Sequence, residues 1–223
     1  MRKAIAHAVD SEAVLKATTP LSTTKALSML PSWMPGFTDK TATYPYDPER
    51  ARALLRSAGY PEGFTFKQLT IAAAGPSDID LLVKDYLAKV GITMELEMVE
   101  TTVSNQRRNR GDFHSAGRLL PAVNPDTILF SYLHPANAAP NGLNSARYNN
   151  PQVTRLLEEA RAEANAERRI QMYHEVQRLV MEDLPYIPRT QNSWIWPAWN
   201  AVKGVVLNKL ADVDFWPVTV EAR

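Results

Sequence analysis

The chain has 223 residues, of which 45% are hydrophobic and 22% are charged, and its formal net charge at pH 7 is +1. These values are ordinary for a folded globular protein, and the near-neutral charge gives no reason to expect a nucleic acid or an anionic membrane surface as a partner. Cysteine is absent, which excludes disulfides, thiol nucleophiles and cysteine-ligated metals.

The N-terminal 46 residues predict a helical segment followed by a loop. Residues 1–17 predict a helix that is interrupted at Asp10, whose side chain can cap the second part. No long apolar stretch follows the basic residues at positions 2 and 3, so we expect no signal peptide here, and no apolar run in the sequence approaches the length of a membrane span. The following loop, residues 18–46, contains four prolines and three expected anchors, Leu30, Trp33 and Met34.

Residues 47–63, DPERARALLRSAGYPEG, predict a short helix with both its start and end signals. Asp47 can accept hydrogen bonds from the first free amides, and Pro48 suits the first helical position, where an N–H would be unpaired anyway. Gly59 favours the left-handed conformation that ends a helix, and Pro61 prevents its continuation. One apolar face is expected to pack on a core: Ala51, Leu54, Leu55 and Ala58.

Residues 64–99 predict a strand, a helix and a second strand. The first strand, residues 64–73, is rich in β-branched and aromatic side chains. The helix begins after a capping pair formed by Ser77 and Asp80 and ends at Gly91. Residues 92–99 alternate hydrophobic and polar side chains, as a strand with one buried face does. With connections this short, the segment predicts a βαβ unit whose two strands are parallel.

The C-terminal half predicts another strand, three helices and a β-rich end. The strand covers residues 111–120, and Asn124 can cap a short helix after it. Two longer helices follow, one starting at Pro151 and one over residues 166–183. The last forty residues are β-rich and contain four of the five tryptophans.

Catalytic and metal-binding patterns do not occur in the sequence. There is no GxSxG nucleophile segment, no HExxH pair and no glycine-rich phosphate loop, and no two of the four histidines have metal-ligand spacing. We therefore expect no enzyme, no metal site and no cofactor. The cluster of Arg107, Arg108 and Arg110 is short, which favours a solvated helix end over a nucleic-acid site.

Two tryptophan-containing segments punctuated by proline are candidate ligand contacts. PSWMPGF contains Trp33, and SWIWPAWN begins with Ser193 and Trp194. Large amphipathic aromatic side chains suit binding clefts, but covering the edge of a domain is an equally good explanation.

Five sequence blocks, in the same order and spacing, resemble the extracytoplasmic solute-binding proteins of the dipeptide/oligopeptide type (family 5), which deliver ligands to ABC importers. The blocks are RKAIAHAVDSEAVLKA, YPYDPERARALLRSAGYPEG, LLVKDYLAKVGITMELEMVE, YNNPQVTRLLEEARAE and RIQMYHEVQRLVMEDLPYIP. They cover most of the chain, and five consecutive matches are highly specific together.

The resemblance implies a fold, a place in the cell and a set of partners. Family members are usually about twice this length or more, have two lobes that close over a ligand, and are periplasmic or otherwise extracytoplasmic. The expected fold is α/β, a lobe like that of type II periplasmic binding proteins, with a mixed sheet, a parallel βαβ unit flanked by helices and a β-rich tail. Residues 1–185 would form the second lobe, and residues 186–223 would return to a first lobe that this chain lacks. The implied partners are a small-molecule ligand, that first lobe and ABC permease subunits, with no nucleic acid.

The resemblance also bears on ligand choice. In dipeptide binders a segment like GWTGDxxDPDN carries an Asp that pairs with the ligand's α-amino group. An ungapped match to GRLLPAVNPDT puts Pro121 at that Asp and Arg118 at the Trp. Because Pro cannot pair with an ammonium, we do not expect a simple dipeptide carrier. Arg118 would suit a carboxylate or phosphate, although a structural ion pair explains it nearly as well. The expected ligand-binding residues are Arg118, Leu119, Asn124, Asp126, Trp33 and Trp194.

A second function class stays open from the sequence. The same lobe could dock a protein in signalling or in a chaperone-like role, without transport. A first lobe encoded upstream of Met1 would favour the importer, whereas a true start at Met1 would favour the alternative.

Overall fold

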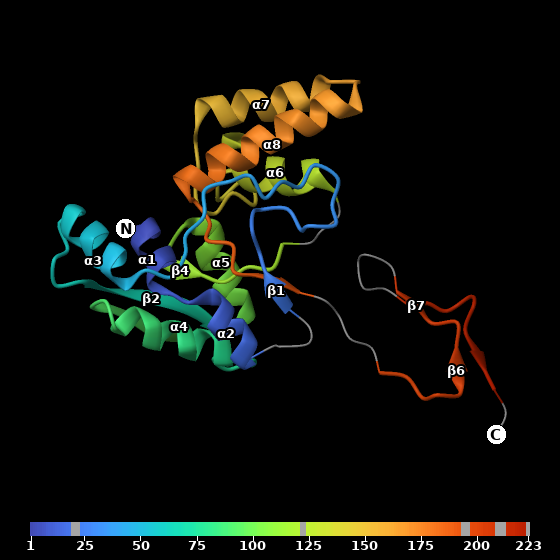
Figure 1. Cartoon of the computed structure of the whole chain (residues 1–223), viewed down its shortest axis with the longest axis horizontal. Coiled ribbons are helices and arrows are strands. Elements are labelled where there is room, and N and C mark those ends of the chain that lie inside the picture. Colours follow the sequence, from blue (N-terminus) through green and yellow to red (C-terminus); the bar gives the residue numbers. More distant parts are fainter. Residues whose placement is uncertain (19–22, 121–123, 193–196, 208–212, 222–223) are drawn as a thin grey trace.

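The computed structural model describes residues 1–18, 23–120, 124–192, 197–207 and 213–221, and places them in a two-layered body with an extended C-terminal segment (Figure 1). One layer contains a three-stranded sheet with its helices, and the other contains three long helices. Among the described residues, no helix combines the length and apolar character that crossing a membrane requires.

The N-terminal helices follow the predicted start and end signals. Helices α1 (Arg2–Ala8) and α2 (Ser11–Thr18) are separated at Asp10, whose carboxylate accepts a hydrogen bond from the Ala13 N–H at 2.9 Å. Helix α3 (Pro48–Ser57) begins after Asp47, which accepts one from the Arg50 N–H at 2.8 Å. Its apolar face is shorter than predicted. Ala51 and Leu55 are buried and Leu54 is half-buried, but Ala58 is exposed because it already caps the end of the helix.

The sheet confirms the predicted βαβ unit. Strands β2 (Phe64–Ile71) and β3 (Ile92–Val99) are parallel, with Phe64 opposite Ile92, and helix α4 (Asp78–Ala88) connects them. The short strand β4 (Ser115–Ala116) adds to the other side of β2, also in parallel, so the order is β3-β2-β4. The predicted strand over 111–120 is therefore too long, because only two of its residues pair with β2.

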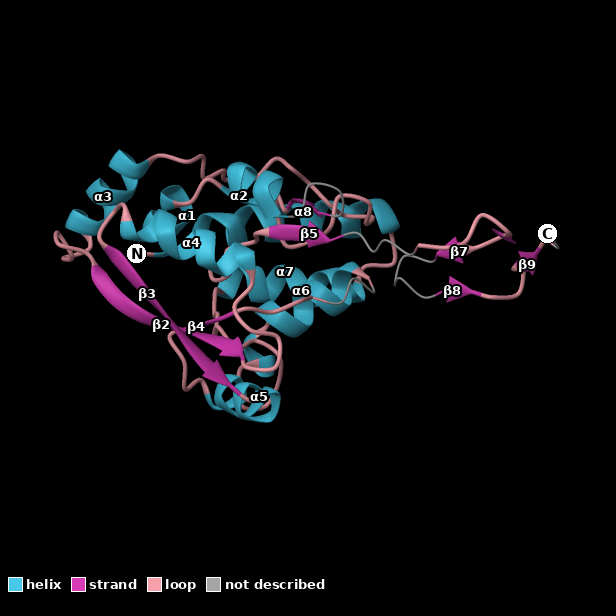
Figure 2. Ribbon diagram, turned by 90° about the horizontal axis from the view of Figure 1, so that it is seen from below, coloured by secondary structure: helices cyan, strands magenta, loops and turns pink. Residues whose placement is uncertain are grey.

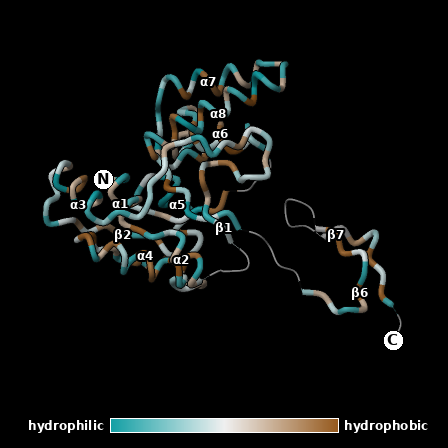
Figure 3. The backbone as a smooth tube through the Cα atoms, in the orientation of Figure 1, coloured by the Kyte–Doolittle hydropathy of each residue, from teal (hydrophilic) through white to brown (hydrophobic). Residues whose placement is uncertain are grey.

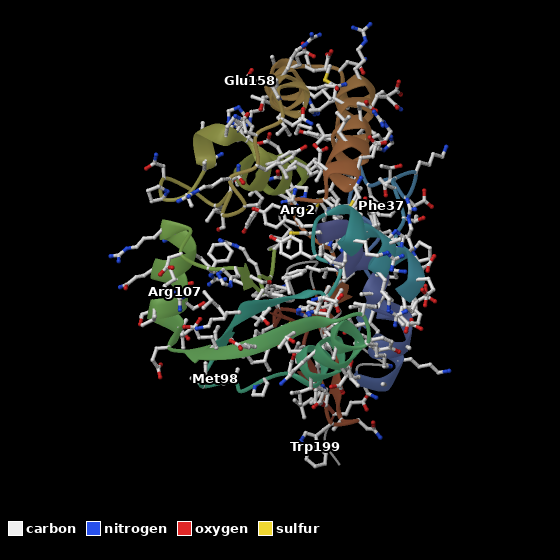
Figure 4. The ribbon with its side chains drawn as sticks, turned by 90° about the vertical axis from the view of Figure 1, so that its left-hand side faces the viewer. Arg2, Phe37, Met98, Arg107, Glu158 and Trp199 are labelled. Atoms are coloured by element: carbon white, nitrogen blue, oxygen red, sulfur yellow. The ribbon has the colours of Figure 1, made fainter. Side chains whose placement is uncertain are left out.

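The two halves of this sheet differ in how they are covered. Phe64, Phe66, Ile92 and Met94 face a hydrophobic core shared with α1, α3 and α4. The alternation predicted for residues 92–99 fails at Met98, which is 44% exposed because it lies near the end of an edge strand (Figure 4). Helix α5 (Thr101–Arg110) lies beyond the carboxyl ends of β2 and β4, as Figure 2 shows.

The second layer consists of α6 (Pro125–Leu133), α7 (Pro151–Ala162) and α8 (Ala166–Asp183), all near their predicted bounds. A short 3-10 helix, η1 (Pro135–Asn137), follows α6. Leu30 and Met34 from the preceding loop are buried against these helices as expected. Trp33 is 39% exposed, the least buried of the three expected anchors, and its anchoring role stays a prediction.

Six further short strands lie in the described residues. Strand β1 (Thr23–Lys25), inside the predicted loop, pairs antiparallel with β5 (Thr190–Asn192). Beyond β5, two antiparallel pairs extend away from the body (Figure 1): β6 (Val202–Lys203) with β9 (Thr219–Val220), and β7 (Val206–Leu207) with β8 (Val213–Asp214). Hydrophobic positions continue along this segment (Figure 3), and Trp199 and Trp216 are 80% and 96% exposed.

Candidate functional site

The residues expected to bind a ligand lie on three segments. Arg118 and Leu119 follow β4, whereas Asn124 and Asp126 lie at the start of α6. Trp33 lies in the loop before α3. Trp194 and Pro121 fall outside the residues that the structure describes.

Asn124 and Asp126 are both engaged in contacts within the helical layer. The Asn124 side chain accepts a hydrogen bond from the Thr127 N–H at 2.8 Å and so caps α6. The Asp126 carboxylate accepts two hydrogen bonds from Arg161, each 2.8 Å long. The Arg161 guanidinium also lies 3.2 Å from the centroid of the Phe130 ring. These contacts give both side chains a structural role, and ligand contact by either of them stays a prediction.

Arg118 differs because its contacts are to neutral groups. Its Nη1 donates to the Ser145 hydroxyl at 3.4 Å, and its guanidinium carbon lies 4.9 Å from the centroid of the Tyr132 ring. Within the described part of the chain Arg118 forms no ion pair, so the alternative of a structural salt bridge finds no support there. Leu119 beside it is 68% exposed. Together they present a cation next to an accessible apolar side chain.

Arg108 is a second cation at this place, and the sequence prediction missed it. Its Nη1 donates to the carbonyl of Gly117 at 3.2 Å, and its Nη2 donates to the side-chain oxygen of Asn105. Its Nε is buried and has no hydrogen-bond partner among the described residues. Burial, and then the charge of Arg118, lower the pKa of Arg108 below the usual arginine value. The solvated helix end predicted from the sequence therefore describes Arg110 but not Arg108.

Two tyrosines, Tyr132 and Tyr186, lie close to Arg118 in this cationic site. The Tyr186 hydroxyl donates to the Tyr132 carbonyl at 3.2 Å and accepts from the Ala146 N–H at 3.4 Å. Burial raises the pKa of Tyr186, so the phenol stays neutral. We refer to Arg108, Arg118, Tyr132, Ser145 and Tyr186 as the arginine site.

The arginine site lies where the strands of the sheet end. Segment 117–120 leaves β4 at its carboxyl end, beside α5 (Figure 2). Gly117 passes close to the sheet, since a Cβ there would lie 3.8 Å from Nε2 of Gln68. In open sheets of parallel strands, ligands bind outside the carboxyl ends of the strands. The fold therefore places this pair of arginines at the edge where a ligand is expected.

A separate cavity of about 230 Å³ lies under α5. Its charged groups mostly pair with one another: Arg107, labelled in Figure 4, donates to Glu97 at 2.7 Å and lies 3.3 Å from the Asp112 carboxylate. The hydrogen bond from Arg107 lowers the pKa of Glu97. The remaining lining residues are Lys67, Leu69, Phe113 and His114. This internal pairing makes the cavity a weaker candidate for a charged ligand than the arginine site.

A metal centre finds no support in the described residues, which contain no group of three His, Cys, Asp or Glu side chains placed to hold an ion. The four histidines have other roles where contacts are defined. His134, for example, is buried, with its Nε2 3.2 Å from the Glu158 carboxylate, and stacks on Phe130.

Known proteins resemble this chain over nearly its full length. The family model for bacterial extracellular solute-binding proteins, family 5 (middle), matches residues 1–140. Heme-binding protein A of Haemophilus influenzae is 31% identical over the whole chain, and the dipeptide-binding protein of Escherichia coli is 26% identical over 99% of it. The periplasmic binding protein DppA of Helicobacter pylori, solved with the peptide STSA, superposes with a TM-score of 0.85 at 27% identity and covers 99% of the chain.

These matches cover nearly all of this chain but less than half of each relative. The chain spans 42% of each of the two curated relatives and 44% of the solved one. It belongs to the family 5 solute-binding proteins, with the type II periplasmic-binding fold of its structural neighbours.

Proposed function

We propose that this family 5 chain is the second lobe of the receptor of an ABC importer, and that it helps to capture a polar organic solute and deliver it to the permease. The relatives support a binding role, since those named above are binding proteins and not enzymes. The protein would then act outside the cytoplasm, with the ABC permease subunits as its membrane partners.

The division of the chain is part of this proposal. Residues 1–185 would form the lobe, and residues 186–223 would form a tail that returns to a first lobe outside this chain. The exposed aromatic side chains of Trp199, Phe215 and Trp216 support this division, because so much exposed aromatic surface on one short segment is typical of a buried interface. The relatives, more than twice as long as this chain, leave room for such a lobe.

The solute would bind at the arginine site and carry a negative charge. The observation that supports this most strongly is Arg118, half-buried at the carboxyl edge of the sheet with neutral partners. Pro121 replaces the Asp that dipeptide binders use for the α-amino group, so an ordinary dipeptide would leave its ammonium unpaired. Leu119 would contact an apolar part of the solute, and Trp33 and Trp194 stay candidate contacts.

Ligand identification and a transport assay test the function. The full-length protein would be purified without refolding and its bound solutes identified by native mass spectrometry. We expect an anionic organic solute to co-purify with the protein. We also expect the protein to stimulate ATP hydrolysis by its partner ABC permease in proteoliposomes. Absence of both would refute the importer function. Capture of a single protein partner instead, with no solute bound, would support the alternative docking role.

Substitution of Arg118 tests the site. Arg118→Gln should weaken solute binding about tenfold or more, because charge-assisted hydrogen bonds of this kind contribute roughly 1.5–3 kcal/mol. Arg155→Gln is the matched control, since Arg155 is exposed on α7 and pairs only with Glu159 among the described residues. Equal affinities of the two variants would exclude Arg118 from the site.

A further inference from the structure

We propose that Arg108 and Arg118 act as a pair and select a solute that carries a dianionic group, such as a phosphate monoester or two adjacent carboxylates. This inference rests on the proposed solute-binding function and names the charge of the solute that the site selects. The cavity under α5 and the polar network of Asp183 support weaker inferences, because Arg107 pairs with Glu97 and Asp112, and Asp183 accepts from Tyr148 and Asn150. The exposed tail already belongs to the proposed function.

The first step concerns the distance between the two cations. Arg108 donates to the carbonyl of Gly117, the residue directly before Arg118. The Arg108 guanidinium is therefore held at the backbone segment that carries Arg118, and the charge of Arg118 acts on Arg108. Two like charges this close repel each other, and the folded chain retains both.

The second step concerns compensation. Several other arginines in this protein lie against carboxylates: Arg107 against Glu97 and Asp112, Arg161 against Asp126, and Arg178 against Glu175 and Glu182. The described partners of Arg108 and Arg118 are instead an amide, a backbone carbonyl, a hydroxyl and an aromatic ring. Residues 121–123, Pro-Ala-Val, which follow in the chain, carry no charge either.

The third step concerns the unmade hydrogen bond. Nε of Arg108 is buried without a partner among the residues that the structure describes, and leaving a buried charged donor unpaired costs free energy. An anion held between the two guanidinium groups would neutralise their repulsion, and a small rotation of Arg108 would give Nε an acceptor. Arginine binds carboxylate and phosphate through two parallel N–H groups, so a pair of arginines matches two negative charges better than one.

Calorimetric titration of the full-length protein with simple anions tests the charge selectivity. Inorganic phosphate and succinate are the dianionic probes, and acetate is the monoanionic control. We expect phosphate or succinate to bind at least about tenfold more tightly than acetate at pH 7.5 and low salt. Acetate binding as tightly as both dianions, or no binding of either dianion, would overturn the inference.

Variants locate the binding on the two arginines. Arg108→Gln and Arg118→Gln should each weaken the dianion about tenfold and leave acetate within about threefold, whereas Arg155→Gln should change neither. Thermal melting establishes that each variant is folded. If Arg108→Gln does not fold, Arg108→Lys, which keeps the charge but loses the planar fork, should still weaken the dianion severalfold. Unchanged dianion affinity in a folded Arg108 variant would overturn the pairing.

Failure of this inference is distinguishable from failure of the proposed function. If the natural solute co-purifies and the permease is stimulated while Arg108→Gln binds that solute normally, the importer function stands and the pairing is wrong. If no solute binds and the permease is not stimulated, the function itself is wrong.

Discussion

The two hydrophobic cores of this protein are assembled in different ways. The sheet core takes all its buried residues from positions 4–94, within the N-terminal half of the chain. The helical core combines residues 29–34 with residues 128–180, so it joins segments more than ninety residues apart. Bringing segments that are distant in the chain into one core costs loop-closure entropy. Apolar contacts alone do not fix the alignment of such segments.

In the helical layer, hydrogen bonds of buried polar side chains hold the distant segments in alignment. Gln177, fully buried on α8, accepts from the Ser28 hydroxyl at 2.7 Å and donates to the carbonyl of Gly36 at 2.6 Å. Asn144, also fully buried, donates to the carbonyls of Leu133, His134 and Tyr148. In the sheet layer, two glycines at the starts of β2 and β3 fix the strands instead. The comparison indicates that hydrogen bonds align the distant segments of the helical layer, whereas tight turns align the strands of the sheet.

Truncation of a helical-core side chain should have the largest effect. Leu157→Ala, at a fully buried position of α7, should lower the free energy of unfolding by about 2–5 kcal/mol, because it removes apolar contacts and leaves a cavity. Urea unfolding followed by circular dichroism measures this loss. Leu156→Ala, at the half-buried neighbour, should lose clearly less, and equal losses would contradict the assignment of the core face of α7.

A methyl group at the start of β2 should have the next largest effect. Gly63 has a φ of +85°, and a Cβ there would lie 1.8 Å from the carbonyl oxygen of Gly91. Gly59 has nearly the same φ, +84°, but open space around it. Both alanine variants strain the backbone, so Gly63→Ala should lose about 1–3 kcal/mol more than Gly59→Ala in the same urea experiment. A difference near zero would show that the two turns can separate without cost.

Removal of the polar link in the helical core should have an intermediate effect. Gln177→Leu keeps the volume but leaves the Gly36 carbonyl without this donor and the Ser28 hydroxyl without this acceptor, which should destabilise the protein by about 1–3 kcal/mol. Gln171→Leu, on the exposed face of α8, should stay within about 0.5 kcal/mol. If Gln177→Leu were as stable as the wild type, packing alone would align the segments.

The smallest predicted effect depends on pH. Burial opposes the charge of Asp183, but hydrogen bonds from Tyr148 at 2.6 Å and Asn150 at 2.8 Å outweigh it and lower the pKa of Asp183. Because the folded pKa lies below the unfolded one, the carboxylate stabilises the protein above about pH 4, and this stabilisation is lost as the pH falls through the folded value.

Unfolding at two pH values measures this contribution. Asp183→Asn should lose about 1 kcal/mol or less at pH 7, since the side chain is exposed, and should approach the wild type near pH 2. Asp39→Asn, at another exposed aspartate, is the control for removal of one surface carboxylate. A loss at pH 2 as large as that at pH 7 would contradict an ionic contribution.

Much of the fold could be predicted because its signals are local. The cap residues Asp47, Ser77 and Asn124 accept the hydrogen bonds expected of them, and the helix over 166–183 has its predicted bounds. Strand β1 could not be predicted, since its partner β5 lies 165 positions further along the chain and three residues carry no periodic pattern.

The arginine site was only half predictable. Arg118 was expected because it replaces a Trp within a recognisable segment. Arg108 was not, because three arginines in four positions of a polar helix give no sign of which one the rest of the chain covers. Asn124 and Asp126 fall at the two later Asp positions of the family's segment, and the structure gives their polar groups a cap and an ion pair.

The sequence by itself determined the family, the positions of most helices and the parallel βαβ unit, because caps, hydrophobic periodicity and short motifs are each contained in a few neighbouring residues. Only the tertiary structure decided which polar groups remain uncompensated. Charge compensation depends on neighbours in space, and the 117–120 segment meets Arg108, Tyr132 and Ser145 only after the sheet and the helical layer have packed against each other.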